Sequence, residues 1–331
     1  MSRRTLTARD VLDATSFHAA RALLAAASLG VFEALAGRRA TPGAIARRIG
    51  CDAAATERLV NVLLGMRLVE QEGRRVRLSP GARDLLTEGG SLSLVDLLRH
   101  RGARFKAWSL LEDSVRSGRP VVLAGEEEDD ALALQAARAR RDSARRWAPV
   151  VASWVELGQP RTLLLLGDGP AVFAHHFARA RPRLQITVVD APAAVAVGRE
   201  YLKGLPEARR IRLVAGNGLT EALPEGKFDA AFVADALHAC SLENARKLLR
   251  RVRKALKPKG LLVVRDRLLD DRGPWPLENA LYDLQLLLTT REGRCHRVRE
   301  VADAMRSAGF RNVTVRDAGM ADDERVLTGR V

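Results

Sequence analysis

The first residues suited to ligand chemistry form a turn and a strand end between positions 167 and 190. The tripeptide Gly167-Asp168-Gly169 follows the apolar run 162–166 and precedes a helical pattern, so its backbone can approach a bound ligand closely. Asp190 ends the next apolar run about twenty residues further on, where a carboxylate can accept both ribose hydroxyls of a nucleoside cofactor. Either feature alone also suits a plain structural turn, and their spacing is what indicates a nucleoside site.

Histidine provides the second candidate for chemistry. His238 comes after the apolar run 230–234, where it suits catalysis but equally a structural role, capping the next helix or bonding a neighbouring backbone group. The residues alone leave both roles open. His175 and His176 lie within a helical pattern and are expected to pack or to face solvent. Since no set of His, Cys and carboxylate residues has metal-ligand spacing, no metal is expected.

Alternating strands and helices are expected to position these residues. Apolar strands separated by helices of about ten or more residues predict a parallel sheet covered on both faces. Ligands bind such a doubly wound α/β domain at the carboxyl ends of its strands. The expected strands are 162–166, 185–190, 211–216, 229–235, 260–266 and 313–317, and the expected helices are 173–180, 195–205, 243–256, 279–289 and 298–309.

The front half has a different pattern, in which helices precede a short hairpin. We expect one amphipathic helix over 11–36, a helix over 43–49 opened by Thr41-Pro42, a helix over 54–64, and two strands around Glu72-Gly73. This order is typical of a winged helix. Further helices are expected over 92–116 and 131–157, with a connection over 118–130 between them.

Three long stretches carry a family resemblance. LLLLGDGPAVFAHHFARARPRLQITVVDAPAAV, from position 163, resembles the motif of S-adenosylmethionine-dependent small-molecule O-methyltransferases of the caffeate and bacterial polyketide type. GNGLTEALPEGKFDAAFVADALHACSLENARKLLRRVRKALKPKGLLVVRD and REGRCHRVREVADAMRSAGF are similar to that family's later strands, its Leu-His and Pro-x-Gly elements and its closing Ala-Gly-Phe. The resemblance extends into the front half, where such enzymes carry a winged-helix-like dimerisation domain.

The resemblance implies an overall organisation. A mostly helical winged-helix-like dimerisation domain is expected over 1–100, connecting helices over 101–156, and a Rossmann-like class I methyltransferase domain over 157–331. The implied cofactor is S-adenosylmethionine, and the implied partners are a small-molecule acceptor and a second copy of the chain, paired through the N-terminal domain.

The resemblance also implies roles for individual residues. His238 falls at the position of the family's general base, where a neutral imidazole with a pKa near 6.5 can take the proton of an acceptor hydroxyl. Asp266 matches the carboxylate that orients this histidine. Asp190 is implied to bind the ribose. The implied cofactor contacts are Gly167, Asp168, Gly169, Asp190 and Asp235, with Asn217 and Gly218 on the adenine side.

The chain departs from the family's pattern at several positions, and these keep other functions open. Asp168 replaces a glycine, Ala239-Cys240 replaces Asp-Trp, Cys295 matches a second orienting carboxylate, and Asn217 matches an acid. Methyl transfer to a hydroxyl of a small aromatic or polyketide-like molecule is the leading hypothesis. One alternative is a methyltransferase fold that uses the cofactor structurally in a hydroxylase, decarboxylase or cyclase. A winged-helix DNA-binding regulator is another.

Charge and composition limit the partners and the compartment. The formal net charge is +15, carried by arginines on almost every predicted helix, so solvated helix faces explain it and nucleic acid is not expected as a partner. Three widely separated cysteines suit free thiols in a reducing compartment, and the cytoplasm is expected. No apolar run approaches the ~20 residues of a membrane span, and no secretory signal is expected.

Overall fold

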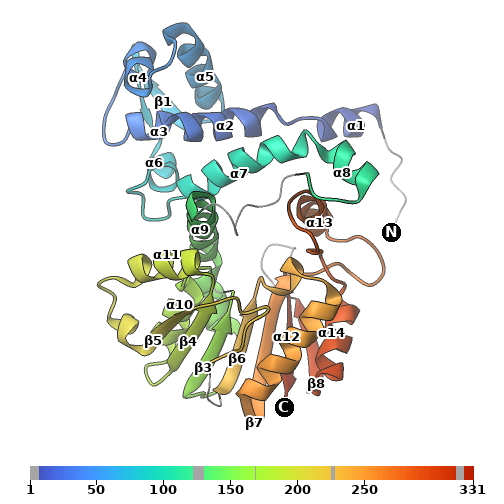
Figure 1. Cartoon of the computed structure of the whole chain (residues 1–331). Coiled ribbons are helices and arrows are strands. Elements are labelled where there is room, and N and C mark those ends of the chain that lie inside the picture. The colour runs from blue at the N-terminus through green and yellow to red at the C-terminus, as the bar shows by residue number, and fades with distance from the viewer. Residues whose placement is uncertain (1–6, 122–129, 168, 225–227, 318–323) are drawn as a thin grey trace. The chain divides into compact units, whose positions relative to one another are not determined.

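The chain divides into two units, Met1–Phe105 and Lys106–Val331, in a computed structural model that describes residues 7–121, 130–167, 169–224, 228–317 and 324–331 (Figure 1). The three-part division expected from the sequence is finer than this and stays a prediction. Among the described residues, no helix combines the length and the apolar character that crossing a membrane requires.

The first unit is a small helical domain with one hairpin. Its helices are α1 (Ala8–Ala14), α2 (His18–Leu29), α3 (Val31–Ala34), α4 (Pro42–Ile49), α5 (Ala53–Gly65) and α6 (Pro80–Leu86), and strands β1 (Val69–Glu72) and β2 (Arg75–Leu78) pair antiparallel; α7 (Val95–Trp108) crosses into the second unit. The side chains of Thr41 and Asp52 accept from backbone N–H groups in the first turns of α4 and α5, which fixes where both helices begin. The predicted order of α4, α5 and hairpin is confirmed.

The single helix expected over 11–36 is wrong. The chain forms α1, α2 and α3 there, and the breaks fall at Thr15 and Gly30. The hydroxyl of Thr15 bonds back to Leu12 O at 2.8 Å, and Gly30 ends α2 in the left-handed conformation with φ of 79°. An apolar period of 3.6 residues continues across both breaks, which is why the pattern alone did not reveal them.

The second unit is built on a seven-stranded sheet of order β5-β4-β3-β6-β7-β9-β8. The strands are β3 (Thr162–Leu166), β4 (Gln185–Asp190), β5 (Ile211–Ala215), β6 (Phe228–Ala234), β7 (Leu256–Arg267), β8 (Arg311–Asp317) and β9 (Glu324–Arg330). The helices are α8 (Leu111–Ser117), α9 (Asp130–Trp154), α10 (Val172–Ala180), α11 (Pro192–Leu202), α12 (Leu242–Ala255), α13 (Leu277–Thr289) and α14 (Val298–Ser307), with the 3-10 turns η1 (Pro206–Arg210) and η2 (Leu237–Ala239).

Helices cover both faces of this sheet, as the apolar strands predict. Alternate residues of β3 point to opposite sides, so Leu163 and Leu165 pack with α9 and α10 while Leu164 and Leu166 pack with α12 and α14. Figure 1 shows the two helical layers on either side of the strands. The Rossmann-like fold expected for this half is confirmed.

The expectation of a wholly parallel sheet is wrong at one edge. Strand β9, which the sequence pattern did not indicate, runs antiparallel to both β7 and β8. Its sequence ERVLTGR offers only Val326 and Leu327 as consecutive apolar residues, and one of its two partners, β7, is distant in the chain. Such a strand is specified by its neighbours in space rather than by its own periodicity.

Candidate active site

The candidate site lies at the carboxyl edge of the sheet in the second unit. Strands β3, β4 and β6 end there at Leu166, Asp190 and Ala234, and β4 and β6 lie on opposite sides of β3. The order of the strands reverses at this point, and open α/β sheets bind ligands in the crevice outside such a reversal.

The turn after β3 requires glycine because other segments lie against it. Gly167 and Gly169 have positive φ values of 70° and 56°. A Cβ on Gly167 would lie 2.2 Å from the carbonyl oxygen of Ala234, and a Cβ on Gly169 would lie 2.6 Å from the Cβ atom of Ala144 on α9. A side chain at either position would therefore displace the end of β6 or helix α9. Asp168, predicted to contact the cofactor with them, lies outside the described residues.

Asp190 places a carboxylate at the end of β4, as predicted. Its side chain is 13% exposed, and its Oδ1 lies 4.0 Å from a guanidinium nitrogen of Arg140 on α9. The same oxygen accepts a hydrogen bond from the backbone N–H of Ala191 at 2.8 Å. The carboxylate is thus held at the sheet edge by its own backbone and flanked by a positive charge.

The turn after β5 is tied to the end of β4. The backbone N–H of Gly216 donates to Asp190 O at 3.0 Å, and the side chain of Asn217 accepts from Leu219 N at 2.9 Å. The structure therefore brings the predicted Asn217 and Gly218 close to Asp190. A pocket of about 440 Å³ opens beside this turn and is lined by Val189, Arg212, Val214, Ala215, Gly216, Glu221, Ala222 and Pro224.

Asp235 follows β6 in the left-handed conformation, with φ of 49°. Its Oδ2 accepts from Arg265 Nη1 at 2.6 Å, and the Arg265 guanidinium carbon lies 5.0 Å from the centre of the Phe173 ring. Its Oδ1 is buried and has no hydrogen-bond partner in the described part of the chain. A buried acceptor of this kind calls for a donor from a ligand or from water.

His238 and Asp266 form a hydrogen-bonded pair next to Asp235. His238 lies on η2 after β6, Asp266 lies in the neighbouring strand β7, and His238 Nδ1 is 2.7 Å from Asp266 Oδ1. Asp266 is fully buried and also accepts from the backbone N–H groups of Leu237 and Arg267, both at 2.8 Å. These bonds fix the carboxylate, and the carboxylate fixes the histidine ring.

The electrostatics of the pair suit a base. Burial by itself lowers the pKa of His238, but the charge and hydrogen bond of Asp266 outweigh it, so that the pKa is raised above its ordinary value of 6.5. Burial likewise opposes the charge of Asp266, and the contacts with His238 reverse this and hold its pKa below the usual range. Asp266 is therefore ionised, and it accepts the proton that His238 carries on Nδ1.

The other ring nitrogen of His238 meets a residue that the sequence analysis did not single out. Tyr282 on α13 places its hydroxyl 3.0 Å from His238 Nε2, and the two rings meet edge to face with centroids 5.1 Å apart. The guanidinium carbon of Arg267 lies 4.8 Å from the centre of the tyrosine ring. Only the low number of tyrosines, two in the chain, sets Tyr282 apart in the sequence.

His296 and Cys295 lie behind the histidine turn. His296 is fully buried, and its Nε2 is 3.0 Å from Leu237 O and 3.1 Å from Cys240 O, so it braces η2 from inside rather than lining a pocket. Burial, with help from nearby acids such as Asp283, raises the pKa of Cys295 to about 12. Cys295 is therefore a neutral thiol and does not replace the family's second carboxylate.

One group in the described residues has the composition of a metal site. Ligand atoms of Asp235, His238 and Asp266 all lie within 4.8 Å of one another. Asp235 is already paired with Arg265, and His238 and Asp266 bond to each other. This arrangement satisfies the charges internally, and the absence of a metal stays a prediction.

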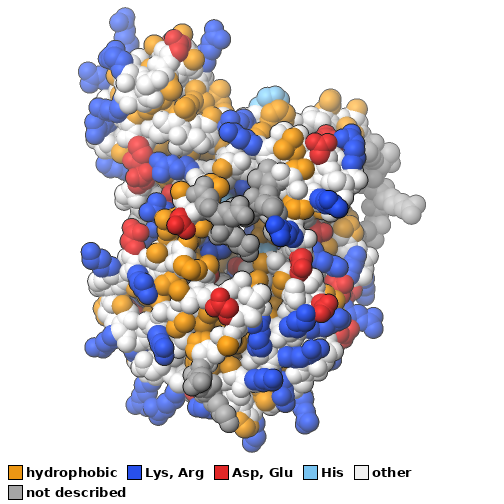
Figure 2. Space-filling view, viewed as in Figure 1, with side chains coloured by type: hydrophobic (Ala, Val, Ile, Leu, Met, Phe, Trp, Pro, Cys, Tyr) orange, Lys and Arg blue, Asp and Glu red, His pale blue; other side chains and the backbone are white. Residues whose placement is uncertain are grey.

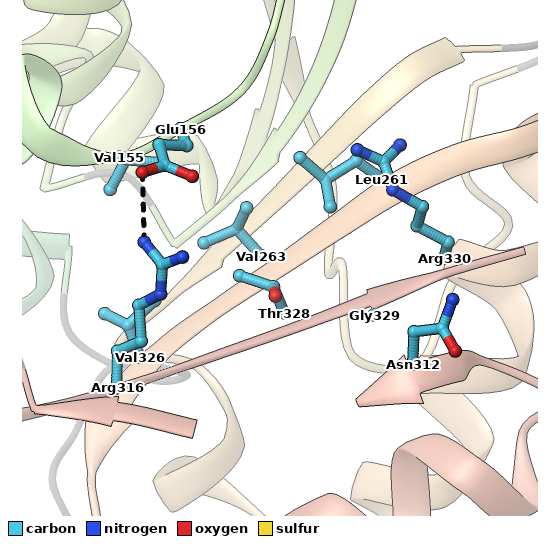
Figure 3. A pocket seen from close by; sticks show the side chains of 10 residues that line it. All are labelled: Val155, Glu156, Leu261, Val263, Asn312, Arg316, Val326, Thr328, Gly329 and Arg330. Carbon is cyan, nitrogen blue, oxygen red and sulfur yellow. Dashed lines mark ion pairs between the residues drawn. The ribbon is translucent and has the colours of Figure 1, made fainter. Parts of the chain in front are cut away.

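A second pocket lies away from this chemistry. It measures about 120 Å³, and its lining includes Leu261 and Val263 of β7 and the ion pair between Glu156 and Arg316 at 3.2 Å (Figure 3). Leu261 and Val263 precede Asp266 in β7, so they lie before the carboxyl end of that strand, where the candidate site is built. It holds none of the predicted site residues.

Two family models match the chain. The O-methyltransferase domain matches residues 108–311, and the O-methyltransferase dimerisation domain matches residues 12–88. The first covers the whole candidate site described above.

Individual relatives match along nearly the full length. The tetracenomycin polyketide synthesis 8-O-methyl transferase TcmO of Streptomyces glaucescens is 28% identical over 97% of this chain and 96% of its own. The N,N-dimethyltransferase OxyT of Streptomyces rimosus is 28% identical over 96% and 93%. The crystal structure of human N-acetylserotonin methyltransferase in complex with SAM superposes with a TM-score of 0.85 at 25% identity, covering 100% of this chain and 99% of that one.

Proposed function

The chain belongs to the O-methyltransferase family, and from this premise we propose that it methylates a hydroxyl of a small aromatic or polyketide-like molecule, with His238 as the general base. The transfer of a methyl group from S-adenosylmethionine to a small molecule is the family's activity. The observation that carries the finer proposal is the His238–Asp266 pair at 2.7 Å on the carboxyl edge of the sheet.

The residues at this edge fit S-adenosylmethionine. The cofactor carries positive sulfonium and ammonium groups and two ribose hydroxyls, and Asp190 and Asp235 offer carboxylates at the ends of β4 and β6. Asp235 Oδ1, buried without a protein partner in the described residues, suits a donor such as the ammonium group. We assign the ribose to Asp190 and the adenine side to the turn of Asn217 and Gly218. When bound, the cofactor supplies an already activated methyl group.

His238 removes the acceptor's proton in this proposal. Its Nδ1 proton is held by Asp266, so the lone pair of Nε2 points away from that carboxylate. Asp266 stabilises the imidazolium that forms when Nε2 takes a proton. The remaining task of the protein is positioning, because an acceptor oxygen held in line with the methyl group reacts without first paying the entropy of encounter.

The acceptor class follows from the surroundings of His238. The ring of Tyr282 and the guanidinium of Arg267 offer a flat aromatic face and a positive charge beside the base, which suits an aromatic, acidic acceptor. The net charge of +15 raises the local concentration of such an anion. The names of TcmO and of the human N-acetylserotonin enzyme support an aromatic hydroxyl, and the name of OxyT makes an amine the runner-up acceptor.

The two alternatives left open by the sequence receive less support. A purely structural use of the cofactor does not need an oriented base, whereas the His238–Asp266 pair is intact. A DNA-binding role has no comparison in its favour, and part of the positive charge at the hairpin is neutralised, because Arg77 pairs with Glu70 and Glu72 at 2.8 and 2.9 Å and Arg39 pairs with Glu72 at 2.6 Å. Figure 2 shows Lys and Arg scattered over the visible face with acidic side chains among them.

A homodimer through the N-terminal domain is part of the proposal. The matching dimerisation model covers residues 12–88, and α1 and the segment that follows it expose Val11, Leu12 and Phe17 by 50%, 68% and 53%. A second copy of the chain would cover these side chains. Light scattering of the purified protein should give twice the chain mass of 36.2 kDa.

Cofactor binding and turnover test the enzymatic proposal together. Titration calorimetry with S-adenosylmethionine should give saturable binding, weakened about tenfold or more by Asp190→Ala, which removes both ribose acceptors. Radiolabelled methyl transfer is then measured on caffeic acid, 1,8-dihydroxyanthraquinone and N-acetylserotonin. The His238→Ala variant should bind the cofactor normally and lose about a hundredfold or more in kcat on the best of these acceptors. Absence of cofactor binding in the wild-type protein refutes the proposal.

A further inference from the structure

We propose that Tyr282 is a catalytic residue, a phenol that relays the acceptor's proton to Nε2 of His238. The inference rests on the proposed role of His238 as the base and adds the group through which that base acts. Nothing in the sequence pattern or in the family match assigns a role to this tyrosine.

In neutral His238, the form that acts as a base, the hydrogen bond between the two side chains has one direction. Ionised Asp266 holds the proton of Nδ1, Nε2 then carries the lone pair, and the Tyr282 hydroxyl at 3.0 Å is the donor. The base is therefore not presented bare to an acceptor. An acceptor hydroxyl reaches Nε2 either by displacing the phenol or by passing its proton through it.

The anchoring of α13 favours passage through the phenol. The side chain of Asn279 donates to Leu268 O at 2.9 Å, and Asp283 accepts from Cys295 N at 2.6 Å, so the turns on both sides of Tyr282 are tied down. Two residues after Asp283, Gln285 accepts from the Trp108 indole at 2.6 Å.

The tyrosine ring is also held by its own contacts. Arg267 lies over it and His238 meets it edge to face. Displacing the phenol would break these contacts together, whereas a relay leaves every one of them in place. A phenolic oxygen can accept a proton on one side while it donates on the other.

The step balances in atoms and charge. A lone pair of the acceptor oxygen forms the new O–CH₃ bond, and the electron pair of the broken S–CH₃ bond goes to sulfur. The acceptor's proton moves to the Tyr282 oxygen as the phenol's own proton moves to His238 Nε2. Tyr282 ends neutral, and His238 ends as an imidazolium paired with Asp266.

The Tyr282→Phe variant tests the relay, because it removes the hydroxyl and keeps the ring. We expect kcat on the best acceptor of the panel to fall about ten- to a hundredfold, with cofactor affinity unchanged. Rates in mixtures of H₂O and D₂O should give a curved proton inventory for the wild type, since two protons move. Tyr201→Phe is the matched control, because Tyr201 is the chain's other tyrosine and also bonds a histidine, His175, at 2.7 Å.

A second measurement needs no substrate. A phenol that donates to Nε2 favours neutral His238, so its removal in Tyr282→Phe should raise the pKa of His238 in an NMR titration of the cofactor-free protein. The chain has six histidines, and His238→Ala identifies the relevant signal. No upward shift would mean that the phenol does not bond Nε2, and the relay would be refuted.

The kinetic outcomes separate the two proposals. If His238→Ala loses activity while Tyr282→Phe keeps kcat within about twofold or exceeds the wild type, the phenol is a bystander or an obstacle, and only the relay fails. If neither variant loses activity, the base role fails as well. Loss in both variants, with Tyr201→Phe unaffected, supports the relay.

Discussion

The second unit contains two centres of the same composition, a histidine, a tyrosine and an acid, that behave in opposite ways. At the sheet edge, His238 lies between Tyr282 and Asp266, at 3.0 and 2.7 Å. On α10, His175 is 2.7 Å from the Tyr201 hydroxyl and 3.7 Å from Glu207. The pKa of His238 is raised, whereas that of His175 is lowered by burial, which Glu207 only partly opposes.

The difference lies in the acid rather than in the histidine. Asp266 has no exposed side-chain surface and is held by backbone N–H groups, whereas the Glu207 side chain is 17% exposed and a full ångström further from its ring. Attraction between charges falls with distance and with access of water. A carboxylate must therefore be buried, fixed and in direct contact before it turns a buried histidine into a base.

Removing the acid should have a large effect on kcat at the first centre and almost none at the second. Asp266→Asn leaves His238 without its charged partner and allows the tautomer that carries its proton on Nε2, which cannot accept a proton there. We therefore expect kcat to fall by about a hundred- to ten-thousandfold. The matched Glu207→Gln variant should stay within about twofold of the wild type. Both are measured by methyl transfer on the same acceptor.

Cofactor affinity provides the control for Asp266→Asn. The carboxylate accepts from three backbone N–H groups, so unchanged binding of S-adenosylmethionine is needed to show that the turn bearing His238 has kept its shape. A folded Asp266→Asn variant with near wild-type kcat would contradict the assignment of Asp266.

The pH dependence of kcat/KM should also distinguish the two histidine centres. His238 must be neutral to accept a proton, so kcat/KM should fall about tenfold per pH unit below its pKa. Because that pKa is raised, the acid limb should have its midpoint above 6.5. In Asp266→Asn the burial of His238 remains without the opposing charge, and the midpoint should move below 6.5. His175→Gln should leave the profile unchanged, and a shift there would mean that the two centres are coupled.

Much of the fold was accessible from the sequence because its strands are buried on both faces. The runs TLLLL and QITVVD are mostly apolar, and they end in the turn and the acid that were singled out. Strand β9 was missed because it has few apolar residues of its own and its place in the sheet depends on β7, which is distant in the chain. The breaks at Thr15 and Gly30 were missed because a continuous apolar period conceals two short interruptions.

The candidate site was predictable only in part, for a related reason. His238 and Asp266 are 28 positions apart and meet because β6 and β7 are neighbours, which the family resemblance supplied and spacing alone does not. Tyr282, which follows His238 by 44 positions, reaches the same ring from α13. No local pattern marks where a helix between the predicted strands 260–266 and 313–317 will place one phenol.

The smallest predicted effect concerns stability and has the opposite sign at the two centres. Burial, with the charges of His175 and Arg179, lowers the pKa of His176 to about 4. Between about pH 4 and the ordinary value of 6.5, the unfolded chain therefore binds more protons at this position than the folded chain, so acid weakens the fold through His176. The His238 pair contributes stability below 6.5 and loses it as the pH rises through the raised pKa. His176→Gln should thus reduce the loss of Tm between pH 7 and pH 5 by roughly 2–4 °C. Calorimetry at both pH values measures this. An unchanged loss of Tm would show that His176 takes up a proton as readily in the folded chain as in the unfolded chain.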